Sequence, residues 1–166
     1  MWAKYKHRSS GFTIVELLIV IVVIGILAAI TIVAYNGIQE RAKFSKAQQD
    51  LASIRKAIKL YYVDNGKYPV STADGWMGWD QATGDSFIPG LTPTYMQKTP
   101  QMDTNLAATD TYLYASTSSG TGFTLQRYRA DGLPATEKTN NPRIKPSDPN
   151  NAWGYWTSNV ATNYSD

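Results

Sequence analysis

The chain has 166 residues, of which 43% are hydrophobic and 17% charged, with no cysteine and a formal net charge of +3. Without cysteine, neither disulfides nor thiol chemistry can support this fold. Lys4, Lys6 and Arg8 account for the excess charge, because the chain after residue 11 balances 13 basic against 13 acidic side chains, which argues against a nucleic-acid-binding protein.

Residues 1–11 are predicted to be a short basic leader in front of a long apolar run. The positive-inside rule places this leader in the cytoplasm and the chain after Asn36 outside. The apolar run exceeds the ~7–15 residues of a secretory signal core, and no small-residue cleavage site follows it. The sequence therefore predicts a single-pass membrane protein.

Residues 12–36 are predicted to be a membrane-spanning half-helix. From Phe12 to Val33 the only side chains that are not apolar are Thr13, Glu16, Gly25 and Thr31. At ~1.5 Å per residue this stretch measures about 33 Å, enough to cross a hydrocarbon core of ~30 Å. A carboxylate in such a segment costs several kcal/mol, so Glu16 is expected to have a dedicated partner.

The same helix is expected to continue as an amphipathic half over residues 37–66, from near Thr13 to near Asn65 overall. No proline interrupts residues 12–68, and Gly66 with Pro69 supplies a stop. One apolar stripe recurs at helical spacing: Phe44, Ala47, Leu51, Ile54, Ile58 and Tyr61. We interpret this stripe as core packing against a head domain; the alternative is a two-stranded coiled coil.

Residues 67–166 are expected to form a globular head. Residues 70–111 read as a structured loop with one short helix, and its large apolar groups are expected to cover the helix and sheet: Trp76, Met77, Trp79, Phe87, Ile88, Leu91, Tyr95 and Met96. Residues 112–117 and 123–129 are predicted strands joined by a hairpin loop over 118–122. On the second strand, Phe123, Leu125, Arg127 and Arg129 share one face.

The chain after this hairpin is harder to interpret. The turn at Asp131–Gly132 ends the second strand, and a third strand after it is one alternative. Residues 134–151 are polar and contain four prolines, which favours a loop or linker. A late strand near Trp153–Ser158 is expected to return to the head.

No catalytic constellation is visible. The only histidine, His7, lies in the leader, and no Cys/His spacing suits a metal. Gly120 and Gly122 fit hairpin geometry better than a phosphate loop. The many aromatic side chains could bind glycan or nucleic acid, although packing is their usual role. We therefore do not expect an enzyme.

The motif Gly-Phe-Thr-Ile-Val-Glu at residues 11–16 resembles the processing site of type IV pilins and pseudopilins. The resemblance covers residues 10–69 and weakens beyond. It implies that a prepilin peptidase cuts between Gly11 and Phe12 and that Phe12 becomes the N-methylated first residue. Glu16, the fifth residue after the cut, then matches the glutamate that this family uses in filament assembly, together with the Phe12 amine.

The pairing of Glu16 with a neighbour's Phe12 amine also has a physical rationale. At ~4 Å and an effective dielectric constant of ~20, the attraction is about 4 kcal/mol before desolvation is subtracted. Only one stagger of two subunits brings the groups together, so the pair would set axial register. The alternative is a local one, in which Glu16 closes a capping box with Thr13. Both roles could coexist.

The resemblance implies an α+β fold, in which the long helix packs on a small antiparallel sheet. Major pseudopilins can bind calcium in the loop after the hairpin, and Asp131, Glu137 and Asp148 are the candidate ligands here. No other cofactor is expected. In filaments of this family, the pilin helix often melts near a proline. This chain has Val33 at that position, so whether its helix melts around Gly25–Val33 stays open.

Taken together, the sequence favours a structural subunit of a type IV pilus, with a pseudopilin of a type II secretion system as the alternative. Adhesion, twitching motility and DNA uptake are not distinguished. The rival from another class is a single-pass anchored binding domain that never polymerises. The expected partners are other copies of the chain, the prepilin peptidase and methyltransferase, and the assembly machinery in the membrane, before display in an extracellular pilus.

Overall fold

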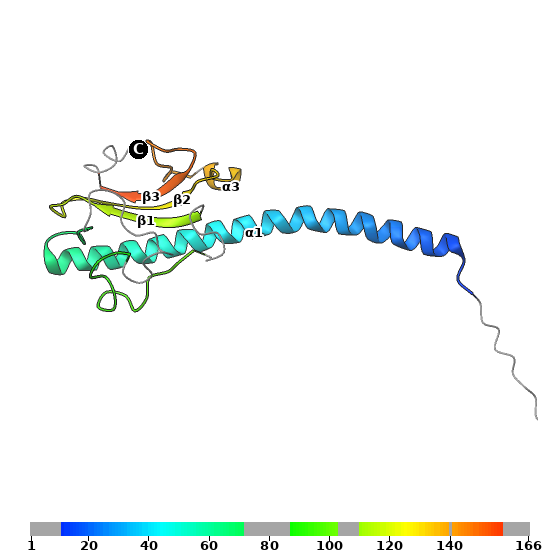
Figure 1. The fold of residues 1–166 in the computed structure, drawn as a ribbon, viewed down its shortest axis with the longest axis horizontal. Helices are drawn as coiled ribbons and strands as arrows, with labels where there is room; N and C mark the ends of the chain where they lie inside the picture. The colour runs from blue at the N-terminus through cyan, green and yellow to red at the C-terminus, as the bar shows by residue number, and fades with distance from the viewer. Residues whose placement is uncertain (1–10, 72–86, 103–109, 140, 158–166) are drawn as a thin grey trace, which may run out of the picture. The chain divides into compact units, whose positions relative to one another are not determined.

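The computed structural model describes residues 11–71, 87–102, 110–139 and 141–157. Its described elements are one long helix, α1, a short helix, α3, and three strands, β1 to β3, in one sheet (Figure 1). The predicted α+β fold, a long helix with a small antiparallel sheet, is confirmed. The chain divides into two units, residues 1–39 and 40–166, which are described separately.

Helix α1 runs over Ile14–Asn65 without interruption, as the sequence predicts. Its end is a left-handed glycine cap: Gly66 has a φ of 68°, and its N–H donates to the Tyr62 carbonyl at 2.8 Å. Glycine adopts this conformation without the steric cost that a side chain would add. The first 26 residues of α1 belong to the first unit and the remainder to the second.

The sheet has the order β1-β2-β3 and is antiparallel throughout. Strands β1 (Asp110–Ser116) and β2 (Phe123–Arg129) form the predicted hairpin, although β1 begins two residues earlier than expected. Strand β3 (Ala152–Trp156) confirms the predicted late strand and ends two residues before Ser158. In the register, Arg127 lies between Tyr112 of β1 and Trp153 of β3.

The alternative of a strand directly after Asp131–Gly132 is wrong. A turn at Gly132 (φ 87°) leads instead into helix α3 (Ala135–Lys138). Pro134 favours this outcome, because its ring fixes φ near the helical value, here −63°, at the position before the first helical residue. Within residues 87–102, the described part of the 70–111 loop, there are turns and no helix; Trp76, Met77 and Trp79 lie outside the described residues.

The apolar stripe of α1 is the centre of the head's core. Ala47, Leu51, Ile54 and Ile58 are fully buried, and Phe44 packs edge-on against Trp153 with ring centroids 5.4 Å apart. Burial of each large aliphatic side chain contributes about 1.5–3 kcal/mol. The coiled-coil alternative is wrong for this stripe, because the chain's own sheet and loop side chains cover it.

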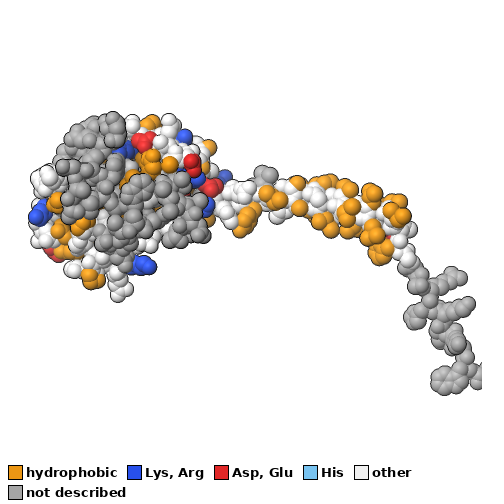
Figure 2. Space-filling model, in the orientation of Figure 1, with side chains coloured by type: hydrophobic (Ala, Val, Ile, Leu, Met, Phe, Trp, Pro, Cys, Tyr) orange, Lys and Arg blue, Asp and Glu red, His pale blue; other side chains and the backbone are white. Residues whose placement is uncertain are grey.

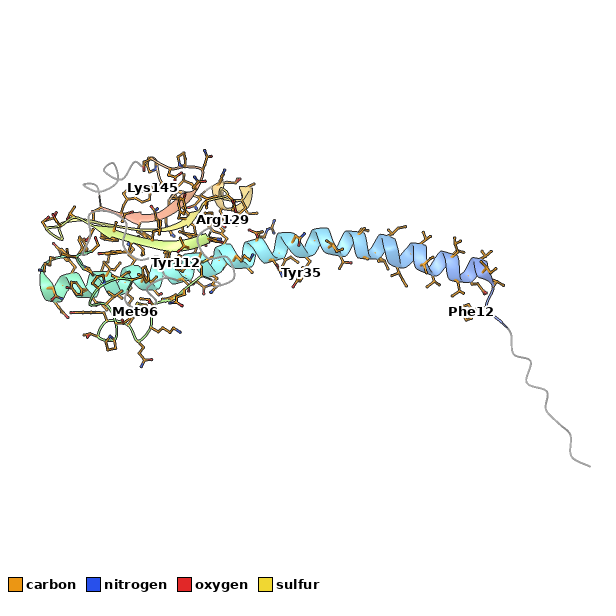
Figure 3. All side chains as sticks on the ribbon, viewed as in Figure 1. Phe12, Tyr35, Met96, Tyr112, Arg129 and Lys145 are labelled. Atoms are coloured by element: carbon orange, nitrogen blue, oxygen red, sulfur yellow. The ribbon has the colours of Figure 1, made fainter. Side chains whose placement is uncertain are left out.

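Polar contacts also join the sheet to the C-terminal part of α1, and Figure 3 labels the two sheet residues that make them, Tyr112 and Arg129. The Tyr112 hydroxyl donates to the Asp50 carboxylate at 2.8 Å, and Arg129 forms an ion pair with Glu40 at 3.1 Å. Of the remaining loop residues predicted to cover the core, Phe87, Ile88 and Leu91 are buried, whereas Tyr95 and Met96 are partly buried against it.

Gly154 in β3 is a position where a side chain is expected to be costly. A Cβ atom there would lie 2.1 Å from the Leu125 carbonyl oxygen and 2.6 Å from the Gln126 Cα. Both atoms belong to the backbone of β2, so β3 must shift to admit a side chain. We therefore expect Gly154→Ala to lower the free energy of unfolding by about 1–3 kcal/mol or more. Chemical denaturation in detergent, followed by near-UV circular dichroism, measures this.

Gly37→Ala is the matched control, because a Cβ atom at Gly37 meets nothing within 4 Å. In a helix interior this change is expected to be neutral or stabilising by up to ~1 kcal/mol. Equal stabilities for the two variants would contradict the close approach of β3 to β2.

Candidate functional site

The candidate site is the junction before the first turn of α1. Gly11, Phe12 and Thr13 precede the helix, which begins at Ile14. Phe12 is 77% exposed, and apart from the chain neighbours of Gly11, no described residue lies within 4 Å of the position of a Cβ on Gly11. A peptidase needs an accessible, non-helical peptide bond, and the Gly11–Phe12 bond meets this requirement.

Glu16 closes a capping box with Thr13. The backbone N–H and the hydroxyl of Thr13 both donate to Glu16 Oε2, at 2.8 and 2.7 Å, and the Glu16 N–H donates back to the Thr13 hydroxyl at 3.2 Å. Thr13 is the N-cap and Glu16 the third helical residue, the spacing that this motif requires. The local role considered for Glu16 is therefore present.

The capping box leaves part of the carboxylate available. Among the described residues, hydrogen bonds reach Oε2 of Glu16 and none reaches Oε1. A carboxylate accepts several hydrogen bonds through its two oxygens. The capping box thus holds the side chain through Oε2 and makes no use of Oε1.

The first unit presents apolar side chains to its surroundings. The described large hydrophobic side chains of α1 between Ile14 and Ile38 are about half or more exposed, and apolar side chains cover much of the visible face of this segment in Figure 2. By length and composition, α1 contains a segment able to cross a membrane, and none of that segment is buried within the described structure. A surface of this kind is stable only when lipid or other protein covers it.

A buried ionic cluster holds the loop after β2 against the sheet. The guanidinium of Arg127, fully buried, binds both oxygens of Asp110 at 2.8 and 3.0 Å and Glu137 Oε1 at 2.6 Å. The second Glu137 oxygen accepts the indole N–H of Trp153 at 2.7 Å. Asp110, Arg127, Glu137 and Trp153, here called the Arg127 cluster, come from β1, β2, α3 and β3.

Burial and charge act in opposite directions on this cluster. Burial raises the pKa of the Glu137 carboxyl, while the Arg127 charge and the Trp153 hydrogen bond oppose that rise. For Arg127, burial alone would lower the pKa, but the hydrogen bonds and charge of Asp110, with the Glu137 charge, raise it. Arg127 therefore remains cationic, and the cluster is a structural ion pair rather than an acid–base centre.

This cluster corrects one of the proposed calcium ligands. Both oxygens of Glu137 are engaged by Arg127 and Trp153, so Glu137 is not available to a metal in this structure. Asp131 is exposed and Asp148 half-buried. Within the described ranges, no group of three or more His, Cys, Asp or Glu side chains is placed to hold a metal ion. Calcium binding through Asp131 and Asp148 stays a prediction.

The pairing of Arg127 with Asp110 was missed from the sequence. The available signal was the position of Arg127 on the same face of its strand as Phe123 and Leu125. A charged side chain on an apolar strand face requires buried counter-ions. The pattern itself does not identify them, because Asp110 and Glu137 are distant in sequence.

A long apolar helix and a small antiparallel sheet define a pilin-like layout, and comparisons with known families agree. Residues 6–32 match the prokaryotic N-terminal methylation motif, and residues 34–146 match the model for type II secretion system protein G. The second match covers more than half of the chain. The chain belongs to the type II secretion system protein G family.

Individual relatives match less than half of the chain. The type II secretion system core proteins G of Aeromonas hydrophila and Pectobacterium carotovorum are both 39% identical, over 66 and 74 residues, covering 40% and 45% of this chain and 46% and 47% of theirs. Fimbrial protein EcpC of Eikenella corrodens is 41% identical over 68 residues, 41% of this chain and 44% of its own. The chain thus spans about half the length of these relatives. No solved structure matches it.

These matches shift the balance between the two filament types considered from the sequence. The family model and the two core proteins G named above belong to type II secretion systems, whereas EcpC is a fimbrial protein. The preference for a type IV pilus subunit is therefore not supported over its alternative. The sequence resemblance identified the pilin-like class correctly but selected the less well supported member.

Proposed function

We propose that this protein is a structural, non-enzymatic pseudopilin of a type II secretion system, which polymerises through its N-terminal helix after processing. The observation that carries the proposal is the match of residues 34–146 to protein G of that system. The exposed junction at Gly11–Phe12 and the capped Glu16 support it, because they supply the cleavage site and a carboxylate with one open oxygen.

The assembly step that we propose follows from charge and register. Cleavage before Phe12 creates a cationic amine four residues before Glu16, close to the membrane level. In a filament, that amine meets Glu16 Oε1 of a neighbouring subunit, and the apolar surface of the two helices leaves lipid together. The proposed partners are other copies of the chain, a prepilin peptidase and methyltransferase, and the membrane machinery that moves subunits into the filament.

A surface pilus is the second candidate, and the 41% identity to a fimbrial protein favours it. The two candidates share processing and polymerisation but differ in where the filament ends. A pseudopilus stays within the cell envelope, whereas a pilus is released from cells by shearing.

Mass spectrometry of the N-terminal peptide tests processing and location together. We expect a methylated Phe12 terminus in the membrane fraction and little of it in material sheared from cells. The same terminus abundant in the sheared fraction would favour the pilus instead. An intact Met1–Gly11 leader in both fractions would contradict both filament roles and favour an anchored binding domain that does not polymerise.

A further inference from the structure

One face of α1 in the second unit is strongly basic. Because successive helical residues turn by about 100°, four cations fall within an arc of about 100°: Arg41, Arg55, Lys56 and Lys59. Arg55 is half-buried and the other three are exposed. The acidic residues in this part of α1 lie outside that arc: Glu40, Asp50 and Asp64. The four cations, here called the basic stripe, extend along about 27 Å of helix.

A polar groove of about 280 Å³ lies on the same face. Its lining residues are Ser45, Gln48, Gln49, Ala52, Arg143 and Tyr155. The four from α1 fall between Arg41 and Arg55, and the other two come from the loop before β3 and from β3 itself. Hydroxyl, amide and guanidinium groups on these walls can donate hydrogen bonds to an anion.

The arginine in this groove is held in place by stacking. The guanidinium carbon of Arg143 lies 4.8 Å from the centroid of the Tyr155 ring. Arg55, which does not line the groove, lies over the same ring at 4.4 Å. Stacking on an aromatic ring fixes the position of a guanidinium without neutralising its charge. The groove and the basic stripe thus place five cations on one side of the second unit.

These five cations have no counter-ion within the described ranges. No described carboxylate oxygen lies within 4 Å of a nitrogen atom of any of them. Between Arg41 and Lys59 the face also carries no large apolar side chain. The core of a protein–protein interface is depleted in charge and enriched in aromatic side chains. This face therefore suits a hydrated anionic surface better than a protein partner.

The chain brings such a surface close to this face. Helix α1 contains a segment able to cross a membrane, and Arg41 follows the predicted end of that segment, Asn36, by five residues. A tethered group meets its ligand at a high effective concentration. Anionic headgroups also attract basic residues next to a membrane span, by about fivefold in affinity for each Lys or Arg.

We propose that the basic stripe and its groove bind the phosphate groups of anionic phospholipids in the membrane that anchors the chain. Arg143 presents its planar donor pair to one phosphate in the groove, beside the amides of Gln48 and Gln49. The cations of the stripe contact neighbouring headgroups. The contact belongs to the unassembled subunit, so it rests on membrane anchoring and holds for either filament type.

Thiol labelling in lipid nanodiscs tests this contact, because the chain has no cysteine of its own. Ala52 is exposed in the groove and Thr94 is exposed in the 87–102 loop, so A52C and T94C are matched reporters in the full chain. With two or more cations engaged, a water-soluble maleimide should modify A52C at least about tenfold more slowly in phosphatidylglycerol than in phosphatidylcholine. T94C should react equally in both lipids, and high salt should remove the difference for A52C.

Two triple variants with the same loss of charge separate the stripe from general attraction. The stripe variant combines Arg41→Gln, Lys56→Gln and Lys59→Gln. The control variant combines changes outside the stripe: Lys43→Gln, Lys46→Gln and Lys98→Gln. We expect the stripe variant to abolish the protection of A52C and the control variant to keep most of it, while Arg143→Gln alone lowers it several-fold. Equal protection in the two triple variants, with both heads folded by near-UV circular dichroism, would overturn the proposal.

Soluble anions distinguish the lipid from other phosphates. In phosphatidylcholine nanodiscs at physiological salt, inorganic phosphate or a short DNA duplex should leave A52C reactive. Protection by either one that equals the protection by phosphatidylglycerol would assign the face to a free anion or to nucleic acid and overturn the lipid contact. Equal reactivity of A52C in the two lipids would also overturn it. None of these outcomes requires polymerisation, so the proposed filament role stands or fails separately.

Discussion

Replacing Glu16 with alanine is expected to lower filament assembly strongly while leaving the head folded and the leader cleavable. The carboxylate supplies the only acidic group within residues 12–39, so its loss leaves the Phe12 amine of the neighbouring subunit without a counter-ion in an apolar setting. An attraction of about 4 kcal/mol before desolvation corresponds to roughly tenfold to a hundredfold in assembly after that cost is subtracted. Filament yield, measured by sedimentation of detergent-free membranes, tests this.

Thr13→Ala separates assembly from helix capping. Thr13 supplies the hydroxyl and N–H that hold Glu16 Oε2, so this variant weakens the capping box by about 1 kcal/mol yet keeps the carboxylate. We expect it to assemble better than Glu16→Ala. Equal losses from the two variants would show that capping alone accounts for Glu16, and wild-type yield from Glu16→Ala would contradict its assembly role.

Replacing Arg127 with alanine is expected to destabilise the head strongly. The change leaves Asp110 and Glu137 buried without their cation, and loss of one partner from a buried ion pair costs about 3–5 kcal/mol. Domains of this size have only about 5–15 kcal/mol of stability. Denaturant titration followed by near-UV circular dichroism should show a large shift of the midpoint, together with loss of the signal from buried Trp153.

Arg129→Ala is the matched control on the same strand. Its ion pair with Glu40 is partly exposed, with side chains 22% and 32% accessible, so the expected cost is about 0–1 kcal/mol. A triple variant with Arg127→Met, Asp110→Asn and Glu137→Gln should recover part of the lost stability, since it removes all three charges together. If Arg127→Ala cost no more than Arg129→Ala, the Arg127 cluster would not be a main support of the loop.

Features that depend on local sequence could be predicted closely. The bounds of α1 follow from an uninterrupted helical pattern between Thr13 and the Gly66 stop, and the hairpin follows from alternating strands around a glycine-containing loop. The capping box of Thr13 and Glu16 was also predictable, because its partners are three residues apart. In each case the interacting groups are neighbours along the chain.

Features that depend on non-local pairing were not predictable. Glu137 was taken for a calcium ligand because the sequence shows a carboxylate in a loop but not the guanidinium that the sheet register brings to it. The two arginines on Tyr155 come from α1 and from the loop before β3, and nothing in their spacing indicates a common ring. The choice between pilus and secretion subunit also needed more than the N-terminal motif, which both filament types share.

The sequence by itself thus determined the apolar helix and the α+β class, because these follow from composition, periodicity and contacts within one helical turn. Only the tertiary structure decided which charges are buried together and which stay open, because strand register and the packing of α1 on the sheet bring residues distant in sequence within hydrogen-bond distance. Arg127 shows the difference: its place on an apolar strand face demands partners, and only the folded chain supplies Asp110 and Glu137.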